Sequence, residues 1–559
     1  SSFVDLQRIA AATSLGSLLT YLTSLAVNHV WSIDEVLMPS LSGIILMFTS
    51  STCLMFMVRV AVKSMFDARR KDEQALKTVI YGIKHGAIGM AKMIKSQSPQ
   101  RYVLDSFISP DGQMVGHMLM GVKVREVKDT LASQLKADGI DAILVSPVQA
   151  DTFREDDHLI TELIANGIKI MMMPHALEWD GKSELPQDQL HEVDIEDLLP
   201  RDKIEVDMNA IGALLTGKRI MITGAAGSIG SEMVRQVAVY HPSELILIDQ
   251  AETPMHDIRL LMQRQFPAIK SETIVASICN ATFMEAIFAA HQPEYVFHAA
   301  AYKHVPMMED NPAMAVQNNI YGTRVIADLA VKYGTKKFVM ISTDKAVNPT
   351  NVMGCSKRIC EIYCQSLNKA IAEGKVKGIT QFVTTRFGNV LGSNGSVIPL
   401  FKQQIRNGGP LTVTHPDIIR FFMLIPEACK LVLEAGTMGN GGEIFVFDMG
   451  KPVKIVDLAK RMIALSGAKN IGIKFTGLRE GEKLYEEVLS DQEENIPTKH
   501  PKIMRAKVRE YEYATACENE KALLDLSYTY NDMDIVKKMK DIVPEYKSQV
   551  SKYEILDKK

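Results

Sequence analysis

Asp344 and Lys345 are adjacent residues that could supply an acid and a base to one reaction. They follow residues 337–342, an apolar run with the composition of a buried strand. In an open α/β sheet, ligands bind outside the carboxyl ends of the strands, where this pair would stand. A solvated surface pair is the alternative, but the position just past a buried strand favours a reactive site. Proton transfer would then need a carboxyl kept neutral and a lysine kept partly neutral.

A glycine-rich turn could hold the phosphates of a dinucleotide. Gly224, Gly227 and Gly230 are spaced GxxGxxG between a strand-like run and a helical one, so they would allow a tight turn and close approach of a pyrophosphate to the helix N-terminus. Asp249 closes the next strand about twenty residues later, where a carboxylate accepts from the ribose hydroxyls. Gln250 rather than Arg follows it, which favours NAD over NADP. A purely structural turn is the alternative.

These residues need a sheet to position them, and residues 216–400 alternate between strand-like and helical segments. The strand-like apolar runs lie at 219–223, 245–248, 273–276, 295–299, 337–342 and 381–387. Repeated strand–helix units predict an α/β fold with a doubly wound parallel sheet. Beyond Gly392 the pattern is mixed and rich in Gly and Pro, which is typical of a smaller substrate-capping region completed by the tail. The catalytic domain is therefore expected to span residues 216–559.

A weaker alternation precedes this domain. Residues 73–178 predict a first Rossmann-like domain, with strand-like runs at 78–82, 142–145 and 168–172. Its glycines follow GxxxGxxG rather than GxGxxG spacing, and no acidic residue closes a clear second strand, so its ligand stays open. A structural or regulatory domain with an empty cleft fits equally well. Residues 179–215 are polar and acidic and predict a linker.

Residues 1–72 predict a transmembrane helical hairpin with its cytoplasmic flank. Residues 9–33 and 36–58 lack Lys, Arg, Asp and Glu, and each run reaches the ~20 residues that span a bilayer. Asp34 and Glu35 lie between them. The basic residues of the outer flanks are Arg8, Arg59, Lys63, Arg69, Arg70 and Lys71.

This charge pattern predicts that both ends of the hairpin are cytoplasmic. We therefore expect a multi-pass protein of a bacterial-type inner (plasma) membrane, with cytoplasmic catalytic domains. A buried soluble hairpin, or a signal peptide for the first run alone, is the alternative. Because the sequence begins with Ser1 rather than Met, further spans ahead of it are compatible with the pattern.

The composition excludes some classes of function. Among 559 residues, 63 basic and 66 acidic side chains give a net charge of -3, which offers no general attraction for nucleic acid. Seven cysteines, an odd number, suggest reduced thiols. Cys360 and Cys364 lie one helical turn apart but lack further zinc ligands, so we expect a packed helix and no metal site.

The order of the glycine turn, residues 341–345 and residues 353–357 resembles the extended short-chain dehydrogenase/reductase superfamily. Members of that superfamily carry a Tyr-x-x-x-Lys pair on a helix. Lys357 occupies the position of the lysine, but Met353 occupies that of the tyrosine, so the usual base is absent.

Segments 298–306, 342–350, 386–392 and 478–483 resemble the UDP-N-acetylglucosamine 4,6-dehydratases of polysaccharide and glycan biosynthesis. The resemblance is to the membrane-anchored long form, which has transmembrane helices, a first Rossmann-like domain and Met in place of the tyrosine. It covers nearly the whole chain. The sequence departs from the family at Ser277, where the third strand usually ends in an Asp near the adenine.

The resemblance implies a reaction in which the C4 hydroxyl is oxidised with hydride transfer to NAD. Lys345 removes the C5 proton, and protonated Asp344 delivers a proton to the departing C6 hydroxyl. Hydride then returns to C6, leaving a 4-keto-6-deoxy sugar with the C5 configuration retained. Lys357 would hold the nicotinamide ribose. The acceptor of the C4 hydroxyl proton stays open between Thr343, Ser342 and a water.

The expected residues form three groups. The catalytic residues are Thr343, Asp344, Lys345, Met353 and Lys357. The NAD-binding residues are Gly224, Gly227, Ser228, Ile229, Gly230, Asp249, Ala299, Ala300 and Lys357. The substrate-binding residues are Lys303 and Glu309 near the sugar, and Asn389, Arg420 and Arg479 near the diphosphate.

Two other functions compete with this one. A UDP-N-acetylhexosamine 4-epimerase shares the fold, NAD and the transient ketone, but it needs no acid at C6 and normally uses the missing tyrosine. Met353 also motivates a non-catalytic membrane scaffold or nucleotide-sugar sensor. Expected partners are UDP-N-acetylglucosamine, the lipid bilayer, a second copy of the chain in a homo-oligomer, and membrane glycan-pathway enzymes.

Overall fold

The computed structural model describes residues 2–31, 40–69, 71–96, 100–172, 191–192, 204–393, 395–468, 470–486 and 494–557. The chain divides into two compact units, Ser1–Val193 and Asp194–Lys559. The predicted linker lies largely outside the described residues, apart from the helix α7 (Met208–Leu215).

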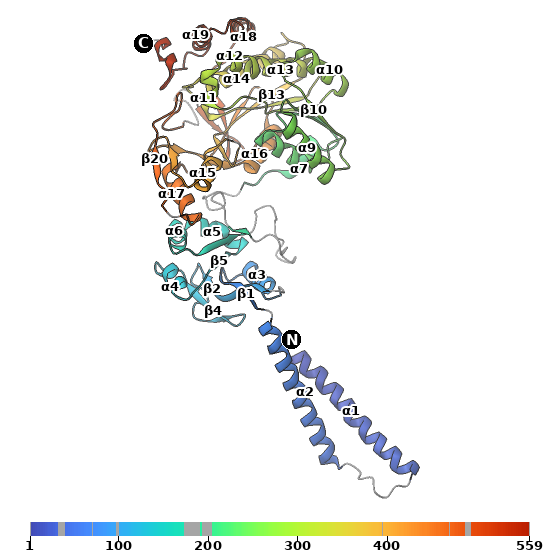
Figure 1. Ribbon diagram of the computed structural model, residues 1–559. Helices are drawn as coiled ribbons and strands as arrows, with labels where there is room; N and C mark the ends of the chain where they lie inside the picture. Colours follow the sequence, from blue (N-terminus) through green and yellow to red (C-terminus); the bar gives the residue numbers. More distant parts are fainter. Residues whose placement is uncertain are drawn as a thin grey trace. The chain divides into compact units, whose positions relative to one another are not determined.

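Helices α1 (Ser2–Trp31) and α2 (Leu41–Arg69) lie side by side, joined by a hydrogen bond of 2.8 Å between the hydroxyls of Thr13 and Thr52 (Figure 1). The stretches Ile9–Val27 and Ser42–Val62 are long and apolar enough to cross a membrane. Their leucines are mostly exposed, which is unlike the core helices of a soluble domain. The turn that carries Asp34 and Glu35 lies outside the described residues.

The first unit also contains a sheet with the strand order β3-β4-β2-β1-β5-β6-β7. Its strands are β1 (Lys71–Tyr81), β2 (Gln100–Ser109), β3 (Met118–Leu119), β4 (Val122–Glu126), β5 (Ala142–Val145), β6 (Lys169–Met172) and β7 (His191–Glu192). The helices of this sheet domain are α3 (His85–Ser96), α4 (Leu131–Ala137), α5 (Ala150–Glu155) and α6 (Asp157–Ala165). The strand β2, which the sequence pattern did not predict, pairs in parallel with β1.

The second unit is built on a sheet with the order β10-β9-β8-β11-β12-β13-β18-β22-β21. Its parallel strands are β8 (Arg219–Thr223), β9 (Glu244–Asp249), β10 (Ser271–Val275), β11 (Tyr295–His298), β12 (Lys337–Ile341), β13 (Gln381–Arg386) and β18 (Ile444–Phe447). Strands β22 (Ile503–Lys507) and β21 (Glu494–Pro497) extend this sheet in antiparallel fashion. The predicted doubly wound α/β fold is confirmed, and the antiparallel extension was not predicted.

Alternating side chains of the buried strands enter two different apolar cores, each formed with its own layer of helices. Ile220 and Ile222 of β8 pack toward α7, α8 (Ser228–Ala238), α9 (Glu252–Gln265) and α16 (Ile425–Met438). Met221 packs toward the layer of α10 (Ala281–His291), α13 (Gly322–Lys332) and α14 (Val352–Ala372). The continuous burial of these strands explains why they read as apolar runs in the sequence.

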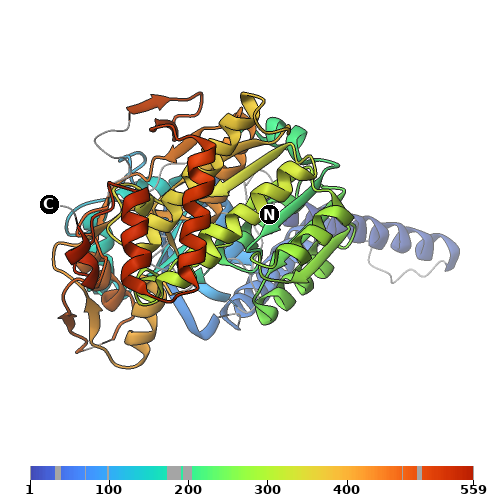
Figure 2. The same ribbon diagram turned by 90° about the horizontal axis from the view of Figure 1, so that it is seen from above.

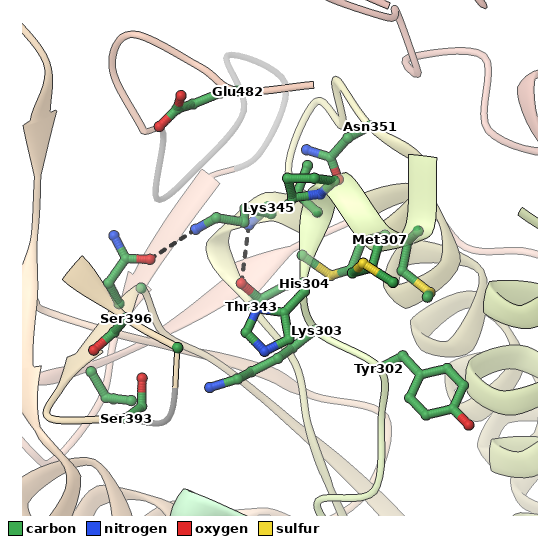
Figure 3. Close-up of a pocket in the computed structure, with 18 of the residues that line it drawn as sticks. Tyr302, Lys303, His304, Met307, Thr343, Lys345, Asn351, Ser393, Ser396 and Glu482 are labelled. Carbon is green, nitrogen blue, oxygen red and sulfur yellow. Dashed lines mark hydrogen bonds between the residues drawn. The ribbon is translucent and has the colours of Figure 1, made fainter. Parts of the chain in front are cut away.

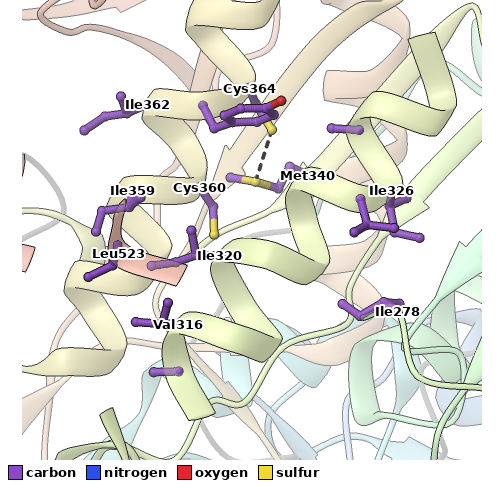
Figure 4. Packing of buried hydrophobic residues seen from close by; sticks show 14 of the residues in the cluster. Ile278, Val316, Ile320, Ile326, Met340, Ile359, Cys360, Ile362, Cys364 and Leu523 are labelled. Atoms are coloured by element: carbon purple, nitrogen blue, oxygen red, sulfur yellow. Dashed lines mark hydrogen bonds between the residues drawn. The ribbon is translucent and has the colours of Figure 1, made fainter. Parts of the chain in front are cut away.

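The α14 layer holds the larger core, part of which Figure 4 shows. Cys360 and Cys364 pack there, with the Cys364 thiol 3.7 Å from the Met340 sulfur. The two C-terminal helices, α18 (Tyr513–Ser527) and α19 (Asp532–Ile542), add Leu523 and Ile535 to the same core, and Figure 2 shows them side by side. The tail therefore belongs partly to the Rossmann core, whereas the sequence pattern assigned it to the substrate cap.

A smaller region after β13 caps the carboxyl end of the sheet. Short strands pair here as β14 (Asn389–Leu391) with β17 (Phe422–Leu424), β15 (Leu411–Val413) with β20 (Ile473–Phe475), and β16 (Ile419–Arg420) with β19 (Val453–Lys454). Helices α15 (Val397–Arg406) and α17 (Ile455–Leu465) enclose a separate apolar core with them. This region places a second set of polar side chains opposite the strand ends.

Candidate active site

The glycine turn follows β8 and leads into α8, and two of its glycines lie where no side chain fits. Gly224 has a φ of +70°, and a Cβ atom there would lie 2.6 Å from the backbone nitrogen of Ala300. A Cβ atom on Gly230 would lie 1.9 Å from the Gly224 carbonyl oxygen. The backbone is therefore packed against itself at the N-terminus of α8, and a helix N-terminus favours a phosphate group.

Asp249 ends β9 beside this turn. One carboxylate oxygen accepts from the Ala226 backbone N–H at 3.1 Å, and the other accepts from the Ala251 N–H at 3.0 Å. A carboxylate oxygen has room for a second donor, so ribose hydroxyls could still bind. These features fit a dinucleotide such as NAD.

A cavity of about 950 Å³ runs from the glycine turn to the capping region, near the upper end of ordinary ligand pockets (Figure 3). The predicted residues that line it are Gly224, Gly227, Ser228, Ile229, Gly230, Ala299, Lys303, Thr343, Lys345, Met353, Lys357, Asn389, Arg420 and Arg479. The predicted residues outside the lining set are Asp249, Ala300, Glu309 and Asp344. Most of the expected cofactor and substrate residues thus meet in one space.

Asp344 and Lys345 lie just past β12, in a single turn of 3₁₀ helix, Asp344–Ala346. The Asp344 carboxyl is buried, and its Oδ1 accepts from the Thr343 hydroxyl at 2.8 Å and from the Lys345 ammonium at 3.0 Å. Asp344 Oδ2 faces Gly388, where a Cβ atom would lie 2.9 Å away. The Lys345 ammonium also donates to Asn389 Oδ1 at 3.1 Å. Asp344 therefore reaches the cavity through Thr343 and Lys345, which both line it.

Burial and neighbouring charges set the protonation of this pair. Burial, together with the nearby carboxylate of Glu486, raises the pKa of Asp344 above its ordinary value, against the opposing charge of Lys345. Burial alone would lower the pKa of Lys345, but Asp344 and Glu486 raise it on balance. The raised pKa of Asp344 suits a proton donor. The raised pKa of Lys345 keeps this residue an ammonium at rest, which differs from the partly neutral lysine expected from the sequence.

Ser342 and Thr343 make different contacts. The Ser342 hydroxyl donates to Glu361 Oε1 at 2.7 Å. Glu361 also accepts from Arg386 at 2.6 and 2.8 Å and from Arg358 at 3.1 Å, and all of these side chains are buried. Ser342 thus belongs to an ionic cluster beneath the site, whereas Thr343 is coupled to the acid.

Met353 lies in the first turn of α14 and lines the cavity, with Lys357 one turn later. His298, at the end of β11, is sandwiched between the hydroxyls of Thr223 at 2.7 Å and Thr323 at 3.0 Å. Burial, with a smaller effect of the Lys357 charge, lowers the pKa of His298 to about 3. His298 is therefore a neutral structural link between β8, β11 and α13.

The predicted substrate residues differ in their freedom to bind a ligand. The Arg420 guanidinium is buried and donates to the carbonyl oxygens of Ile419, Lys483 and Leu484 and to Glu482. It holds the segment 479–486, which we call the substrate loop. The side chains of Lys303 and Arg479 are exposed within the cavity wall.

Glu309 does not reach the cavity, in contrast to the expectation from sequence. Its carboxylate is fully buried and accepts from the Val352 backbone N–H at 3.1 Å and from the Ser551 hydroxyl at 3.5 Å. A Cβ atom on Gly481 would lie 2.9 Å from Glu309 Oε1, so the substrate loop packs against it. Burial raises the pKa of Glu309 to about 7.

A C-terminal segment, residues 547–553, completes this junction. The Lys547 N–H donates to the Pro349 carbonyl at 3.1 Å, and the Gln549 N–H donates to the Thr350 carbonyl at 3.2 Å. The Gln549 carbonyl in turn accepts from the Gly481 N–H at 2.8 Å. The segment thus ties the start of α14 to the substrate loop.

Glu486 is the main site residue that the sequence pattern did not indicate. Its carboxylate lies 3.3 Å from the Lys345 ammonium and 3.5 Å from the Arg420 guanidinium, and it lines the cavity. Its only sequence signal was its place three residues after the segment 478–483. His304, Glu482 and Lys483 line the cavity as well.

Comparisons with known proteins place residues 220–508 in the polysaccharide biosynthesis protein family, whose model they match. The capsular polysaccharide biosynthesis protein CapD of Staphylococcus aureus is 50% identical over 348 residues, which cover 62% of this chain and 57% of that protein. The chain therefore spans little more than half the length of this relative. The probable polysaccharide biosynthesis protein EpsC of Bacillus subtilis is 41% identical over 438 residues, which cover 78% of this chain and 72% of that protein.

Other similar proteins carry different names. A UDP-glucose 4-epimerase of Rickettsia canadensis is 36% identical over 286 residues, which cover 50% of this chain and 80% of that protein. The solved structure of the dTDP-glucose 4,6-dehydratase DesIV of Streptomyces venezuelae with NAD bound is 19% identical, covers 54% of this chain and 94% of that one, and has a TM-score of 0.44.

The family model matches more than half of the chain, and it spans the glycine turn, the Asp344–Lys345 pair and the substrate loop. The chain belongs to the polysaccharide biosynthesis protein family.

Proposed function

We propose that the protein is an NAD-dependent UDP-N-acetylglucosamine 4,6-dehydratase for surface glycan biosynthesis. The observation that carries this proposal is the Asp344–Lys345 pair, whose carboxyl is buried and whose ammonium lines the cavity that begins at the glycine turn. Dehydration needs an acid and a base beside the sugar in addition to hydride transfer. The pair supplies both.

Each residue of the pair has a definite task in this reaction. NAD, when bound, would accept the hydride from C4 and return it to C6. Lys345 first passes a proton to the Asp344 carboxylate 3.0 Å away, which leaves a neutral amine and a neutral carboxyl. The amine then takes the proton from C5, which the C4 ketone has made acidic. Asp344, once protonated, supplies the proton with which the C6 hydroxyl leaves as water. In the structure the Thr343 hydroxyl donates to Asp344 Oδ1 at 2.8 Å, so a relay through Thr343 requires this hydrogen bond to reverse when Asp344 carries the proton. Ser342 and Thr343, the two side-chain candidates for the C4 hydroxyl proton, both line the cavity, and each hydroxyl already donates to a carboxyl group, that of Glu361 and that of Asp344 respectively.

The dinucleotide would rest on the glycine turn, with its pyrophosphate at the amides of Ser228 and Ile229 and its adenosine ribose at Asp249. Lys357 would hold the nicotinamide ribose. Among the residues that the structure describes, Lys345 engages only the oxygen of the Asn389 side chain, so its amide group could donate to the sugar diphosphate. Arg479, exposed in the cavity wall, would pair with the diphosphate charge.

Epimerisation is the second candidate, because relatives named UDP-glucose 4-epimerase are similar over half of the chain. An epimerase inverts C4 by hydride transfer alone and leaves C5 and C6 intact. The buried carboxyl and the lysine beside it would then have no proton to move at C5 or C6.

Incubation of the full chain with UDP-N-acetylglucosamine separates the two candidates. We expect a product that is lighter than the substrate by one water molecule, about 18 mass units. Its NMR spectrum should show a 4-keto group and a C6 methyl signal. When the reaction is run in deuterated water, deuterium should appear at C5, because the proton removed from C5 is replaced from the solvent. Recovery of only the galacto epimer at unchanged mass would assign epimerisation instead.

We further propose that α1 and α2 cross the membrane as a hairpin, with the catalytic unit on the cytoplasmic side. Both helices exceed the length that spans a bilayer, and Leu15 and Leu46 expose 61% and 69% of their surface. Basic residues flank the hairpin and none lies between its spans, which favours cytoplasmic ends. The product would then be released near membrane-bound glycan-pathway enzymes.

Extraction of membranes with alkaline carbonate tests the hairpin. We expect the full chain to stay in the membrane pellet after the wash and to dissolve only with detergent. Release of the chain by carbonate alone would show that it is attached to the surface and does not span the bilayer.

A further inference from the structure

We propose that Glu486 is a positioning residue whose carboxylate holds the Lys345 ammonium and whose charge sets the pH range in which the Asp344–Lys345 pair works. The inference deepens the proposed dehydration and rests on it for the role of the pair.

The Glu486 carboxylate is in direct contact with Lys345, the proposed base. Its Oε1 lies 3.3 Å from the Lys345 nitrogen, while Asp344 Oδ1 lies 3.0 Å from the same nitrogen. Lys345 is thus held between two carboxylates, one from the end of β12 and one from the substrate loop. Lys483 of the same loop donates to the Val347 carbonyl at 3.1 Å, and Glu486 is the loop residue that contacts the base.

Within the described part of the chain, the buried carboxylate of Glu486 is paired with cations through one oxygen only. The residue exposes 9% of its surface, and its Oε2 atom accepts no hydrogen bond from any residue that the structure describes. Burial opposes its ionisation, yet Lys345 and Arg420 lower its pKa on balance. Glu486 therefore remains an anion with one oxygen unpaired, and in a buried setting such a charge acts strongly on its neighbours.

Several charged groups face the pair. Asp344, Glu486 and Arg420 influence Lys345 through their charges, and Glu486 and Lys345 influence Asp344. Lys483 acts on Glu486 from within the substrate loop, and Glu482 binds Arg420 at 3.2 Å. Among these groups, Glu486 raises the pKa of both members of the pair.

Because the Glu486 charge raises the pKa of both Asp344 and Lys345, the direction of the expected pH shift follows. Removing a negative charge that lies near two ionisable groups lowers the pKa of both, whichever group holds a given proton in the coupled pair. The activity requires one protonated and one unprotonated group, so it follows a bell-shaped curve against pH. Loss of the Glu486 charge should shift the whole curve to lower pH, whereas a purely structural defect would lower the curve without moving it.

The experiment compares Glu486→Gln with the wild-type chain. We expect both midpoints of the kcat profile to fall by about one pH unit or more, the size expected for one close charge. Competitive acetylation across a pH series, read on the Lys345 peptide by mass spectrometry, should show the same downward shift of the lysine midpoint without any substrate.

Two further variants serve as controls. Glu486→Asp keeps the charge and should hold the midpoints near those of the wild type. Glu482→Gln removes a carboxylate from the same loop that binds Arg420 and has no contact with Lys345 among the described residues, so its midpoints should also stay in place.

The outcomes separate this inference from the proposed function. An unchanged Lys345 acetylation midpoint in Glu486→Gln would overturn the inference, even if the rate fell. A shifted midpoint in a protein that forms no 4-keto product would support the charge effect of Glu486 and overturn the dehydratase.

Discussion

Replacing Lys345 with Arg should abolish formation of the 4-keto product while leaving NAD bound. Arginine keeps a positive charge between Asp344 and Glu486, but it does not lose its proton at working pH, so it cannot take the C5 proton. General-base catalysis contributes about 10²–10⁴-fold, and a loss of that size is expected in kcat. The measurement is product formation together with the NAD content of the purified protein.

Lys345→Ala is the matched comparison, because it removes both the base and the charge. It should be as inactive as Lys345→Arg, and solvent deuterium should not enter C5 in either variant. NAD should stay bound in both, since Lys345 lies beyond the glycine turn. If Lys345→Arg kept more than about a tenth of the wild-type rate, far above the loss that a missing base causes, another group would have to be the base.

Replacing Glu361 with Gln should destabilise the catalytic unit by about 3–5 kcal/mol, the cost of breaking a buried ion pair. Glu361 is fully buried and binds Ser342, Arg358 and Arg386, and the amide of Gln would remove the carboxylate that pairs with both buried guanidinium groups, of which Arg358 keeps a contact with Glu545 at 3.4 Å. The expected result is a lower thermal unfolding midpoint of the catalytic unit, followed by calorimetry in detergent.

The effect of Glu361 should depend on pH. Burial would raise the pKa of Glu361, but the charges of Arg386 and Arg358 and the hydrogen bonds lower it from 4.5 to about 2. Ionised Glu361 therefore contributes stability that is complete above pH 4.5 and is lost as the pH falls toward 2. The gap between wild type and Glu361→Gln should be wider at pH 7 than at pH 3.

An exposed pair gives the control for this variant. Glu285→Gln removes the partner of Lys332 on the surface, where ion pairs contribute little. Its unfolding midpoint should match that of the wild type at both pH values. An equal fall of the unfolding midpoint in Glu361→Gln and Glu285→Gln would show that the buried ion cluster contributes no more to stability than the exposed pair.

The strands and the glycine turn of the second unit were predicted because local sequence determines them. The strands of the second unit are buried on both faces, so each reads as an apolar run, and Gly224 and Gly230 stand where any side chain would collide with backbone. By contrast, β2 carries Asp105 within the strand, where it pairs with Lys77 and Arg125. Because this charged residue interrupts the segment, it does not read as an apolar run, and the strand was not predicted.

The parts that were missed depend on contacts between distant segments. Glu309 follows β11 closely enough to suggest a substrate contact, but Ser551 and the backbone of Val352 and Gly481 enclose it. Glu486 meets Lys345 only because the substrate loop folds back over the end of β12. No spacing rule within a single sequence reports such a meeting, because its cause is the tertiary fold.

The segment 547–553 also orders events during synthesis. Chains fold from the N-terminus as they leave the ribosome, so the glycine turn and β8–β13 can assemble well before this segment exists. The junction of the substrate loop with α14 needs Gln549, which is translated roughly tens of seconds after the glycine turn at about 5–20 residues per second. A growing chain could thus bind its dinucleotide early and yet not act on sugar nucleotides until residues 547–553 have left the ribosome. Nascent chains would then compete for the cofactor pool but not for substrate.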